Sequence, residues 1–268
     1  MGVLLFNTSR RENGLPLNLV IHKALADKTP ETATPRNTIQ HFNSSIFISM
    51  TTKLFQFGLY AWLCAVIGFA ILSPNKVGML NETTKNMYFH VPMSITAVVA
   101  FLTSVWFSVM YLRRKNLDDD LNAEAASGLG FMFNLLAMMT GAIWAKVTWG
   151  AFWHWDPRQT TIFLVFLIYA AYFALRSAIP AAEKRAALAS VYSIFSFPAL
   201  IFLYFVLPRL IPGLHPGSDK GDVNPAVSST TDPMIRVILY ASMLGFAALF
   251  FWMHSLRVRQ MRLEQKLS

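Results

Sequence analysis

The stretch WGAFWHWDPR, residues 149–158, lies between two long apolar runs, and the rest of this 268-residue chain is organised around it. Three of the seven tryptophans fall within seven of its residues, together with Phe152 and His154. Tryptophan favours the boundary between lipid and water, because its ring is apolar and its N–H group is polar. The stretch therefore predicts a short aromatic platform at a membrane surface, held between two membrane-spanning helices.

The composition of the whole chain agrees with a membrane protein. Hydrophobic residues make up 54% and charged residues only 14%, whereas soluble domains have about a quarter charged residues. The apolar residues come in blocks near the roughly 20 residues that a spanning helix needs. We expect an all-α fold, a polytopic bundle of six transmembrane helices with short loops, with spans at about 54–73, 92–112, 129–147, 160–179, 188–208 and 236–256.

The two ends of the chain look different from the apolar middle. Residues 1–53 are polar and show no helical period, so we expect a cytoplasmic tail that is disordered or that reflects a misassigned start, since Met50 directly precedes the first span. Residues 54–257 form the predicted membrane domain. Residues 258–268 form a short cytoplasmic tail.

Lysine and arginine predict the orientation of the spans. Six spans place both termini on one side, and that side has sixteen of the 23 Lys and Arg residues, against seven on the other. The positive-inside rule then puts both termini in the cytoplasm. The tryptophan stretch and the loops at 74–91 and 209–235 face outward. Because the cations flank the spans, the net charge of +9 indicates topology and not nucleic-acid binding.

Cysteine usage excludes several classes of redox protein. Cys64 is the single cysteine of the sequence and lies inside the first apolar block. Neither a disulfide, a CxxC pair nor a CxxCH haem-attachment motif can therefore form within this chain. A c-type cytochrome and a thiol oxidoreductase are both excluded.

Three of the six histidines fall on the predicted outer side, at His90, His154 and His215. A polar interfacial role is the common alternative for any one of them, but two at span mouths beside a tryptophan platform favour a pair of metal ligands. Zinc would need further ligands, and no HExxH or paired-cysteine motif is present. Haem fits better, because it takes axial imidazoles and stacks on indoles. A bis-histidine haem buried for electron transfer is disfavoured, since only His254 lies near a span interior.

Four outward cations lie at span ends. In one interpretation they reach lipid headgroups, and in the other they pair with the propionates of a bound haem. They are Lys146, Arg158, Arg209 and Arg236.

Part of the motif also has a structural explanation. Asp156 suits the N-cap of the fourth span, Pro157 suits its first position, and Gln159 falls where a capping box needs it. Asp156 and Gln159 are thus candidates for starting a helix as much as for contacting a ligand. If the preceding residues form a helical turn, Trp149 and Trp153 share one face with Phe152.

The string Trp149-Gly-x-x-Trp153-x-Trp155-Asp156-Pro157-Arg158 resembles the tryptophan-rich WWD signature of the CcmC, CcmF and CcsA superfamily, whose members handle haem in cytochrome c maturation. Its place between the third and fourth of six spans is similar to CcmC. So are His90 at the start of the second span and His215 between the fifth and sixth. The resemblance covers roughly residues 54–257.

The resemblance implies a site and partners. His90 and His215 would be axial ligands of the haem iron, and the WWD segment would face the haem, through Trp149, Trp153, Trp155, Asp156 and Arg158. Such proteins hold haem b transiently and non-covalently at the periplasmic face of the bacterial inner membrane. They present it to the haem chaperone CcmE, beside the ABC transporter CcmAB and the small protein CcmD. The chain would then be a haem-presenting factor and not an enzyme.

Three other functions stay open at this point. CcsA-type proteins share the WWD motif, so a CcsA-like role in haem delivery or ligation is the first alternative. A permease would move haem or another solute through its own bundle. A subunit that only docks an ABC transporter would bind no haem.

Overall fold

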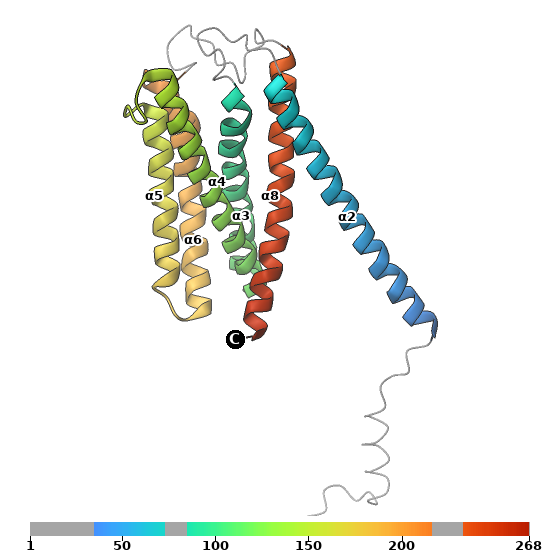
Figure 1. Ribbon diagram of the computed structural model, residues 1–268. Coiled ribbons are helices and arrows are strands. Elements are labelled where there is room, and N and C mark those ends of the chain that lie inside the picture. The colour runs from blue at the N-terminus through green and yellow to red at the C-terminus, as the bar shows by residue number, and fades with distance from the viewer. Residues whose placement is uncertain (1–34, 73–84, 216–232, 268) are drawn as a thin grey trace, which may run out of the picture. The chain divides into compact units, whose positions relative to one another are not determined.

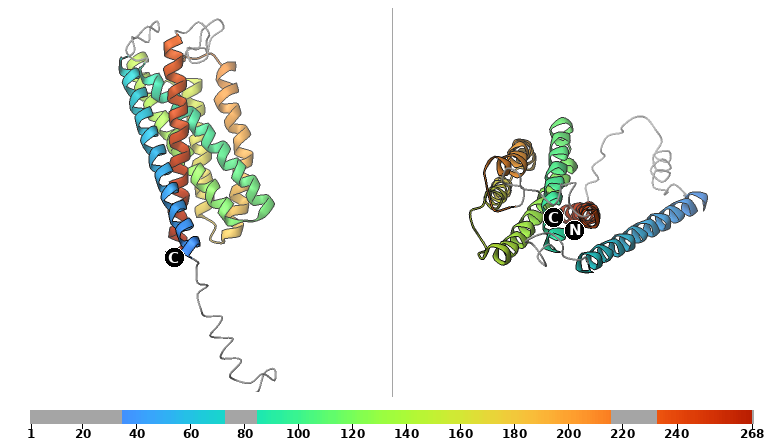
Figure 2. Two further views of the ribbon diagram at one scale, coloured as in Figure 1. Left: turned by 90° about the vertical axis from the view of Figure 1, so that its right-hand side faces the viewer. Right: turned by 90° about the horizontal axis from the view of Figure 1, so that it is seen from above.

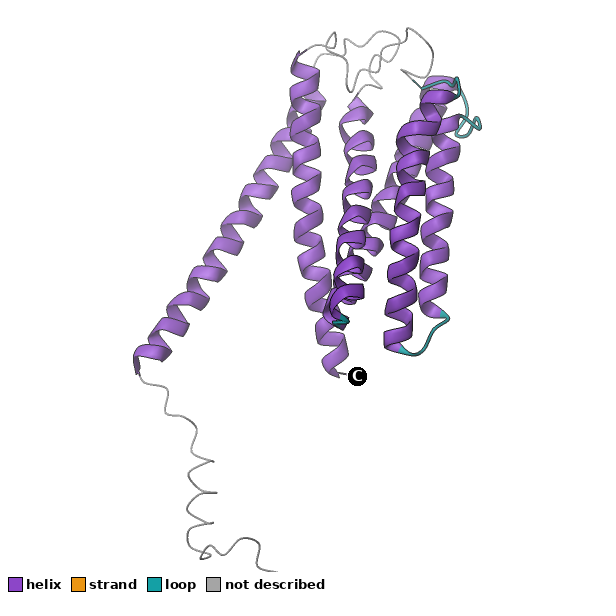
Figure 3. Cartoon of the chain, turned by 180° about the vertical axis from the view of Figure 1, so that it is seen from behind, coloured by secondary structure: helices purple, strands orange, loops and turns teal. Residues whose placement is uncertain are grey.

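The computed structural model describes residues 35–72, 85–215 and 233–267, with side chains from residue 52 onward. Six helices in these ranges are long and apolar enough to cross a membrane, which confirms the predicted bundle. Helices are the regular elements throughout the described part of the chain, and no strand occurs there (Figures 1 and 3). They are α2 (Pro35–Leu72), α3 (Met87–Arg114), α4 (Leu117–Trp149), α5 (Pro157–Ser177), α6 (Ala182–Ile201), the π-helical stretch η2 (Phe202–Val206), α7 (Leu207–Leu210) and α8 (Pro233–Leu267).

The chain divides into two compact units, Met1–Phe57 and Gly58–Ser268. In the first unit, residues 35–53 are helical, so the expectation of irregular structure up to residue 53 is wrong for them. Residues 1–34 lie outside the described part of the chain, and their predicted disorder stays a prediction. The second unit contains five of the six candidate spans in full and is described below.

Several helices extend beyond the predicted spans because charged residues continue them. α4 begins at Leu117, twelve residues before the predicted boundary at 129. The Asn116 side chain caps this end by accepting a hydrogen bond from the Asp118 N–H group, and three aspartates occupy the first turn. Carboxylates near a helix N-terminus interact favourably with its dipole. A search for blocks of apolar residues cannot detect a helix that begins with polar residues in this way.

α3 lies at the centre of the second unit and packs against α4, α6 and α8 (Figure 2). Small residues allow the helices to approach closely, as in other membrane bundles. Ala97, Ala100 and Ala126 are completely buried, and a Cβ atom at Gly130 would lie 2.7 Å from the Phe101 ring. The core is therefore built from alanine and glycine that alternate with large aromatic rings.

The helix ends that carry the motif residues gather at one end of the bundle. α4 ends and α5 begins there, joined by the short loop at the top of Figure 1, and α3 and α8 begin at the same end. The loop between α5 and α6 lies at the opposite end, where α8 also terminates (Figure 1). The bundle thus brings together residues that are far apart in the sequence.

The opposite end contains a buried ion-pair network. Arg176 near the end of α5 is 5% exposed and makes two hydrogen bonds to Asp120 of α4, at 2.7 and 2.9 Å. It also pairs with Glu124. Nearer the middle, Ser104 of α3 bonds to Ser127 of α4 and Ser193 of α6, at 2.7 and 3.2 Å. These polar groups tie neighbouring helices together, since a buried charge or hydroxyl needs such partners.

Candidate functional site

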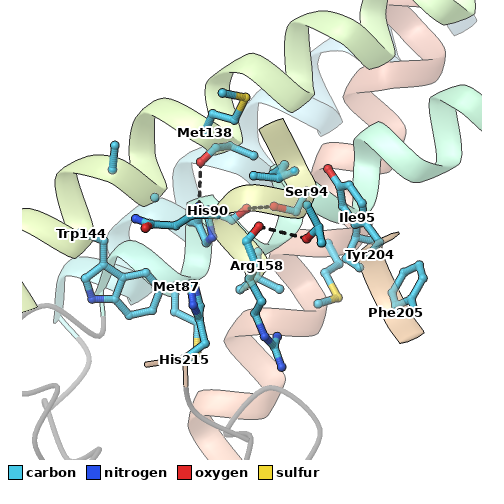
Figure 4. Close-up of a pocket in the computed structure, with 18 of the residues that line it drawn as sticks. Met87, His90, Ser94, Ile95, Met138, Trp144, Arg158, Tyr204, Phe205 and His215 are labelled. Atoms are coloured by element: carbon cyan, nitrogen blue, oxygen red, sulfur yellow. Dashed lines mark hydrogen bonds between the residues drawn. The ribbon is translucent and has the colours of Figure 1, made fainter. Parts of the chain in front are cut away.

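A cavity of about 400 Å³ opens at the motif-bearing end of the bundle (Figure 4). This volume lies in the range of small-molecule and cofactor sites. Its walls come from six helical elements and from the two loops that carry Trp153 and His215, and they are mostly apolar. The lining residues include Met87, His90 and Ser94 of α3, Met138, Gly141 and Trp144 of α4, Trp153 and Arg158 around the start of α5, Tyr204 and Phe205 of η2, Arg209, His215, and Tyr240 and Met243 of α8.

His90 enters the cavity from the first turns of α3. Its Nδ1 lies 3.0 Å from the Ala137 carbonyl oxygen and 3.2 Å from the Thr140 hydroxyl. A carbonyl oxygen only accepts, so Nδ1 has the proton and donates it to Ala137. Nε2 is then unprotonated and available to a metal ion. This is the usual arrangement of a metal-binding histidine, whose second nitrogen is fixed by a hydrogen bond.

Gly141 explains why the His90 ring can lie against α4. A Cβ atom at this position would lie 2.8 Å from Cε1 of His90, closer than real Cβ contacts allow. The His90 ring also makes a T-shaped contact with the Trp144 ring, with ring centroids 5.8 Å apart. The ring therefore packs against both a glycine and an indole of α4.

His215 approaches from the segment after α7. Its Nδ1 lies 2.6 Å from Oδ1 of Asp156, and its ring meets the edge of Trp149 at a centroid distance of 4.9 Å. An ionised carboxylate only accepts, so Nδ1 donates to it, and Nε2 is the ring nitrogen left for a metal ion. Both His90 and His215 line the cavity and also a smaller adjoining pocket of about 30 Å³.

Asp156 is buried and has several partners at once. Besides His215, its carboxylate accepts the Arg158 N–H at 2.8 Å and the Leu214 N–H at 2.7 Å. Burial alone raises the pKa of Asp156, but the hydrogen bond and charge of His215, with the two backbone N–H groups, outweigh it and lower the pKa to about 2. The carboxylate is therefore ionised at neutral pH.

The predicted start of α5 is confirmed in part. Asp156 is its N-cap and Pro157 its first residue, as expected. The capping-box role of Gln159 is wrong: its Oε1 accepts the His154 N–H at 2.9 Å instead of the N-cap N–H. Gln159 also donates to the Phe152 carbonyl. Gln159 thus organises the loop before the helix.

The loop itself is not a helical turn, so the condition under which Trp149 and Trp153 would share a face with Phe152 is not met. α4 ends at Trp149 because Gly150 adopts a φ of +89°, a left-handed conformation that favours glycine. Trp153 lines the cavity, whereas Trp155 is 74% exposed and does not. Trp155 also has a φ of +56°, which is unusual for a bulky residue.

The structure separates the predicted site residues into groups. His90, His215, Trp153 and Arg158 line the main cavity, and Trp149 lines the adjoining pocket. Asp156 reaches the cavity only through His215. Trp155 is not among the lining residues.

The four cations at span ends also differ in whether they line the cavity. Arg158 and Arg209 line the cavity, and the buried Nε of Arg158 has no hydrogen-bond partner. Lys146 instead donates to the Gly150 carbonyl at 2.8 Å, and neither it nor Arg236 is among the lining residues.

Sequence reasoning missed several lining residues because they lie inside the spans. Trp144, Met138, Tyr204 and Phe205 look like ordinary core or lipid-facing residues in a membrane helix. Tyr204 is anchored by a 2.6 Å hydrogen bond to Asn134 of α4. The one signal in the sequence is the clustering of Trp144 with Trp149 and the motif.

The arrangement suits a metal ion that already has other ligands. Two imidazoles are available, and the residues described here contain no group of three or more His, Cys, Asp or Glu side chains that could hold a bare ion. A macrocycle such as haem supplies four nitrogen ligands in a plane and leaves two axial positions. The apolar walls, the indole edges and the two arginines at the cavity match its flat apolar ring and its carboxylates.

Comparison with known proteins gives one consistent result. The family model described as heme exporter protein C, CcmC, matches residues 37–268. The chain is 30% identical over 198 residues to heme exporter protein C of Paracoccus denitrificans, which covers 73% of this chain and 80% of that protein. It is 32% identical over 181 residues to the protein of the same name from Rhodobacter capsulatus, which covers 66% and 72%. Cytochrome c biogenesis protein CcsA of Panax ginseng is 30% identical over 116 residues, covering 42% of this chain and 35% of that protein.

Proposed function

Because this chain belongs to the CcmC family of haem exporter proteins, we propose that it is a haem-binding membrane protein of cytochrome c maturation. The observation that carries the proposal is the matched pair of histidines. Each uses Nδ1 in a hydrogen bond to the protein and keeps Nε2 for a metal ion, and both line one cavity. Haem b would bind there reversibly and non-covalently, with His90 and His215 as axial ligands.

The other cavity residues would orient the ring. Trp153 and Trp144 offer indole surface, and Trp149 supports His215 from the side. Arg158 and Arg209 are the cations placed to meet the propionates, an interaction that partial desolvation strengthens. Lys146 and Arg236 have no part in this proposal.

The chain would act as a presenting factor that gives its haem to the chaperone CcmE, in a complex with CcmAB and CcmD. We place it in the bacterial inner membrane, with both termini in the cytoplasm and the cavity on the periplasmic side. The length of the match to heme exporter protein C supports this role. A CcsA-like role has weaker support, because the matched region covers only about a third of that relative, 35%.

The alternatives without a haem site are less well supported. A permease would need a polar route through the bundle, but Arg176 and the buried serines bond to neighbouring helices. A subunit that only docks a transporter would leave the paired histidines without a function.

The test is an absorption spectrum of the detergent-purified protein after addition of haem. We expect a Soret band with resolved α and β bands in the reduced state, which is typical of bis-histidine haem. The double variant His90→Ala/His215→Ala should lose it. His254→Gln is the matched control, because His254 lies on α8 with its Nε2 bonded to the Asn122 carbonyl and is not among the lining residues. A wild-type protein that takes up no haem would contradict the proposal.

A further inference from the structure

The two histidines are held by different kinds of hydrogen-bond acceptor. His215 donates to an ionised carboxylate at 2.6 Å, whereas His90 donates to a neutral backbone carbonyl at 3.0 Å. Hydrogen bonds to charged acceptors are shorter and roughly twice as strong as neutral ones. A carboxylate partner also makes a ligating imidazole more basic. The two nitrogen ligands would therefore bind iron unequally.

The carboxylate is built into the fold at this position. The Asp156 side chain is completely buried (0% exposed), and its other hydrogen bonds come from Arg158 N–H and Leu214 N–H. A Cβ atom at Gly213 would lie 2.7 Å from Oδ2 of Asp156, so the chain passes tightly over the carboxylate. Asp156 thus joins the start of α5 to the segment that carries His215.

On the His90 side the nearest acceptors are both neutral. They are the Ala137 carbonyl and the Thr140 hydroxyl, which itself donates to the Leu136 carbonyl at 2.9 Å. Helix α3 and Gly141 fix where the ring lies, but nothing bonded to Nδ1 adds charge to it. The protein thus fixes the position of both imidazole rings, but only His215 has a charged partner that would strengthen it as a ligand.

From this contrast we propose that Asp156 is a positioning residue that makes His215 the anchoring ligand of haem and leaves His90 as the ligand that exchanges first. An incoming ligand from a haem acceptor replaces the His90 Nε2–iron bond while the His215 bond persists. His215 and its carboxylate hold the haem in place until the acceptor has bound the iron. This inference rests on the proposed function, since it concerns haem in this cavity.

The first test is Asp156→Asn in the full-length, haem-loaded protein. Asparagine is an equally good N-cap, and its Oδ1 can still accept from Arg158 N–H and from His215. Its NH2 group replaces the oxygen that accepts Leu214 N–H, so the substitution removes the charge and that one hydrogen bond. We expect haem affinity to fall 10- to 100-fold, as for other outer-shell partners of metal ligands. The affinity for ferric haem should fall more than the affinity for ferrous haem. Each tenfold difference between the two falls in affinity raises the reduction potential by about 59 mV. Asp118→Asn is the matched control, because Asp118 forms an exposed ion pair with Arg262.

The second test identifies the exchanging ligand with carbon monoxide on ferrous haem. If His90 leaves, the wild-type complex and that of His90→Ala should have the same iron–carbon stretching frequency, and that of His215→Ala should differ. Asp156→Asn should shift the frequency in the wild type and in His90→Ala, but not in His215→Ala. A wild-type complex that matches His215→Ala would overturn the proposal.

Failure of this inference can be distinguished from failure of the proposed function. A wild-type protein without haem uptake overturns both. A wild-type protein with a normal bis-histidine spectrum, whose Asp156→Asn variant keeps the same affinity and potential, overturns only the role of Asp156.

Discussion

Gly141 shows how a missing side chain can position the ring of His90, a proposed metal ligand. A Cβ atom there would lie 2.8 Å from Cε1 of His90, so Gly141→Ala should push the ring away from α4 and strain its bond to Ala137. Because an imidazole displaced by about 1 Å cannot ligate well, we expect haem affinity to fall at least about tenfold, within the 10²-fold that such misplacement can cost. Haem titration followed by the Soret band measures this.

Gly128→Ala is the control for that substitution. Gly128 lies on the same helix, and a Cβ atom there would meet no atom within 4 Å. Alanine favours a helix by up to about 1 kcal/mol relative to glycine, so this variant should be at least as stable as the wild type and bind haem normally. Equal haem affinity in the two variants would refute the proposed role of Gly141.

Asp156 gives a prediction for the haem-free protein at acidic pH. Its pKa is lowered from 3.8 to about 2 in the folded state, by His215 and two backbone N–H groups acting against burial. The ionised carboxylate therefore stabilises the fold above pH 4, by about 2 kcal/mol, and this stabilisation is lost as the pH falls from about 4 through 2. Chemical unfolding measures the free energy of unfolding of the wild type and of Asp156→Asn. The difference between the two should be constant from pH 7 to 5 and should disappear below pH 4. A difference that disappears between pH 7 and 5 would mean that another group is responsible.

At the scale of elements, α4 and α5 are joined by the buried network around Arg176. Arg176→Met removes the cation and leaves Asp120 buried without its partner, which typically costs about 3–5 kcal/mol. Thermal unfolding in detergent should show a clear fall in stability. The haem spectrum of the surviving folded protein should not change, because the network lies at the opposite end of the bundle from the cavity.

Arg262→Met is the matched control for that prediction. Arg262 of α8 pairs with Asp118 of α4, but both side chains are nearly half exposed (46% and 45%). Exposed ion pairs contribute about 0.2–1 kcal/mol, so this variant should be close to the wild type. A loss of stability as large as that of Arg176→Met would show that burial is not what makes the difference.

The sequence could predict the membrane-spanning helices well, but not which of their residues face the cavity. Blocks of apolar residues were enough for six spans, but the charged start of α4 and the helical residues before 54 were missed because polar helices have no hydropathy signal. Trp144 and Tyr204 could not be assigned to the site, since an aromatic residue inside a span fits core, lipid and cavity equally well.

The motif could be located but not oriented from the sequence. The left-handed Gly150 turns the chain out of the helix, so Trp153 lines the cavity and Trp155 is exposed. The contact between Asp156 and His215 joins residues 59 positions apart, and no local pattern encodes it. The resemblance implies that Asp156 faces the haem; in the fold its carboxylate bonds to His215 and is not among the residues that line the cavity.

At the scale of the whole molecule, the orientation in the membrane is the main untested prediction. The positive-inside rule puts the loop at 150–156 outside and the loop at 178–181 inside. In a Cys64→Ser background, Phe152→Cys should react with a membrane-impermeant thiol reagent on the periplasmic side, and Ala181→Cys should not. Both positions are exposed in the structure, so a reversed pattern would mean a reversed topology.

The convergence of distant segments on one cavity also sets an order of events during synthesis. His90 leaves the ribosome in the second span, His215 follows only after the fifth, and Tyr240 and Met243 complete the wall from α8. A nascent chain that stops after four crossings has His90 but lacks His215, the other proposed ligand, and the part of the cavity wall that α8 supplies. Under the proposed function, the chain would therefore gain its complete haem site only when translation and insertion are nearly finished.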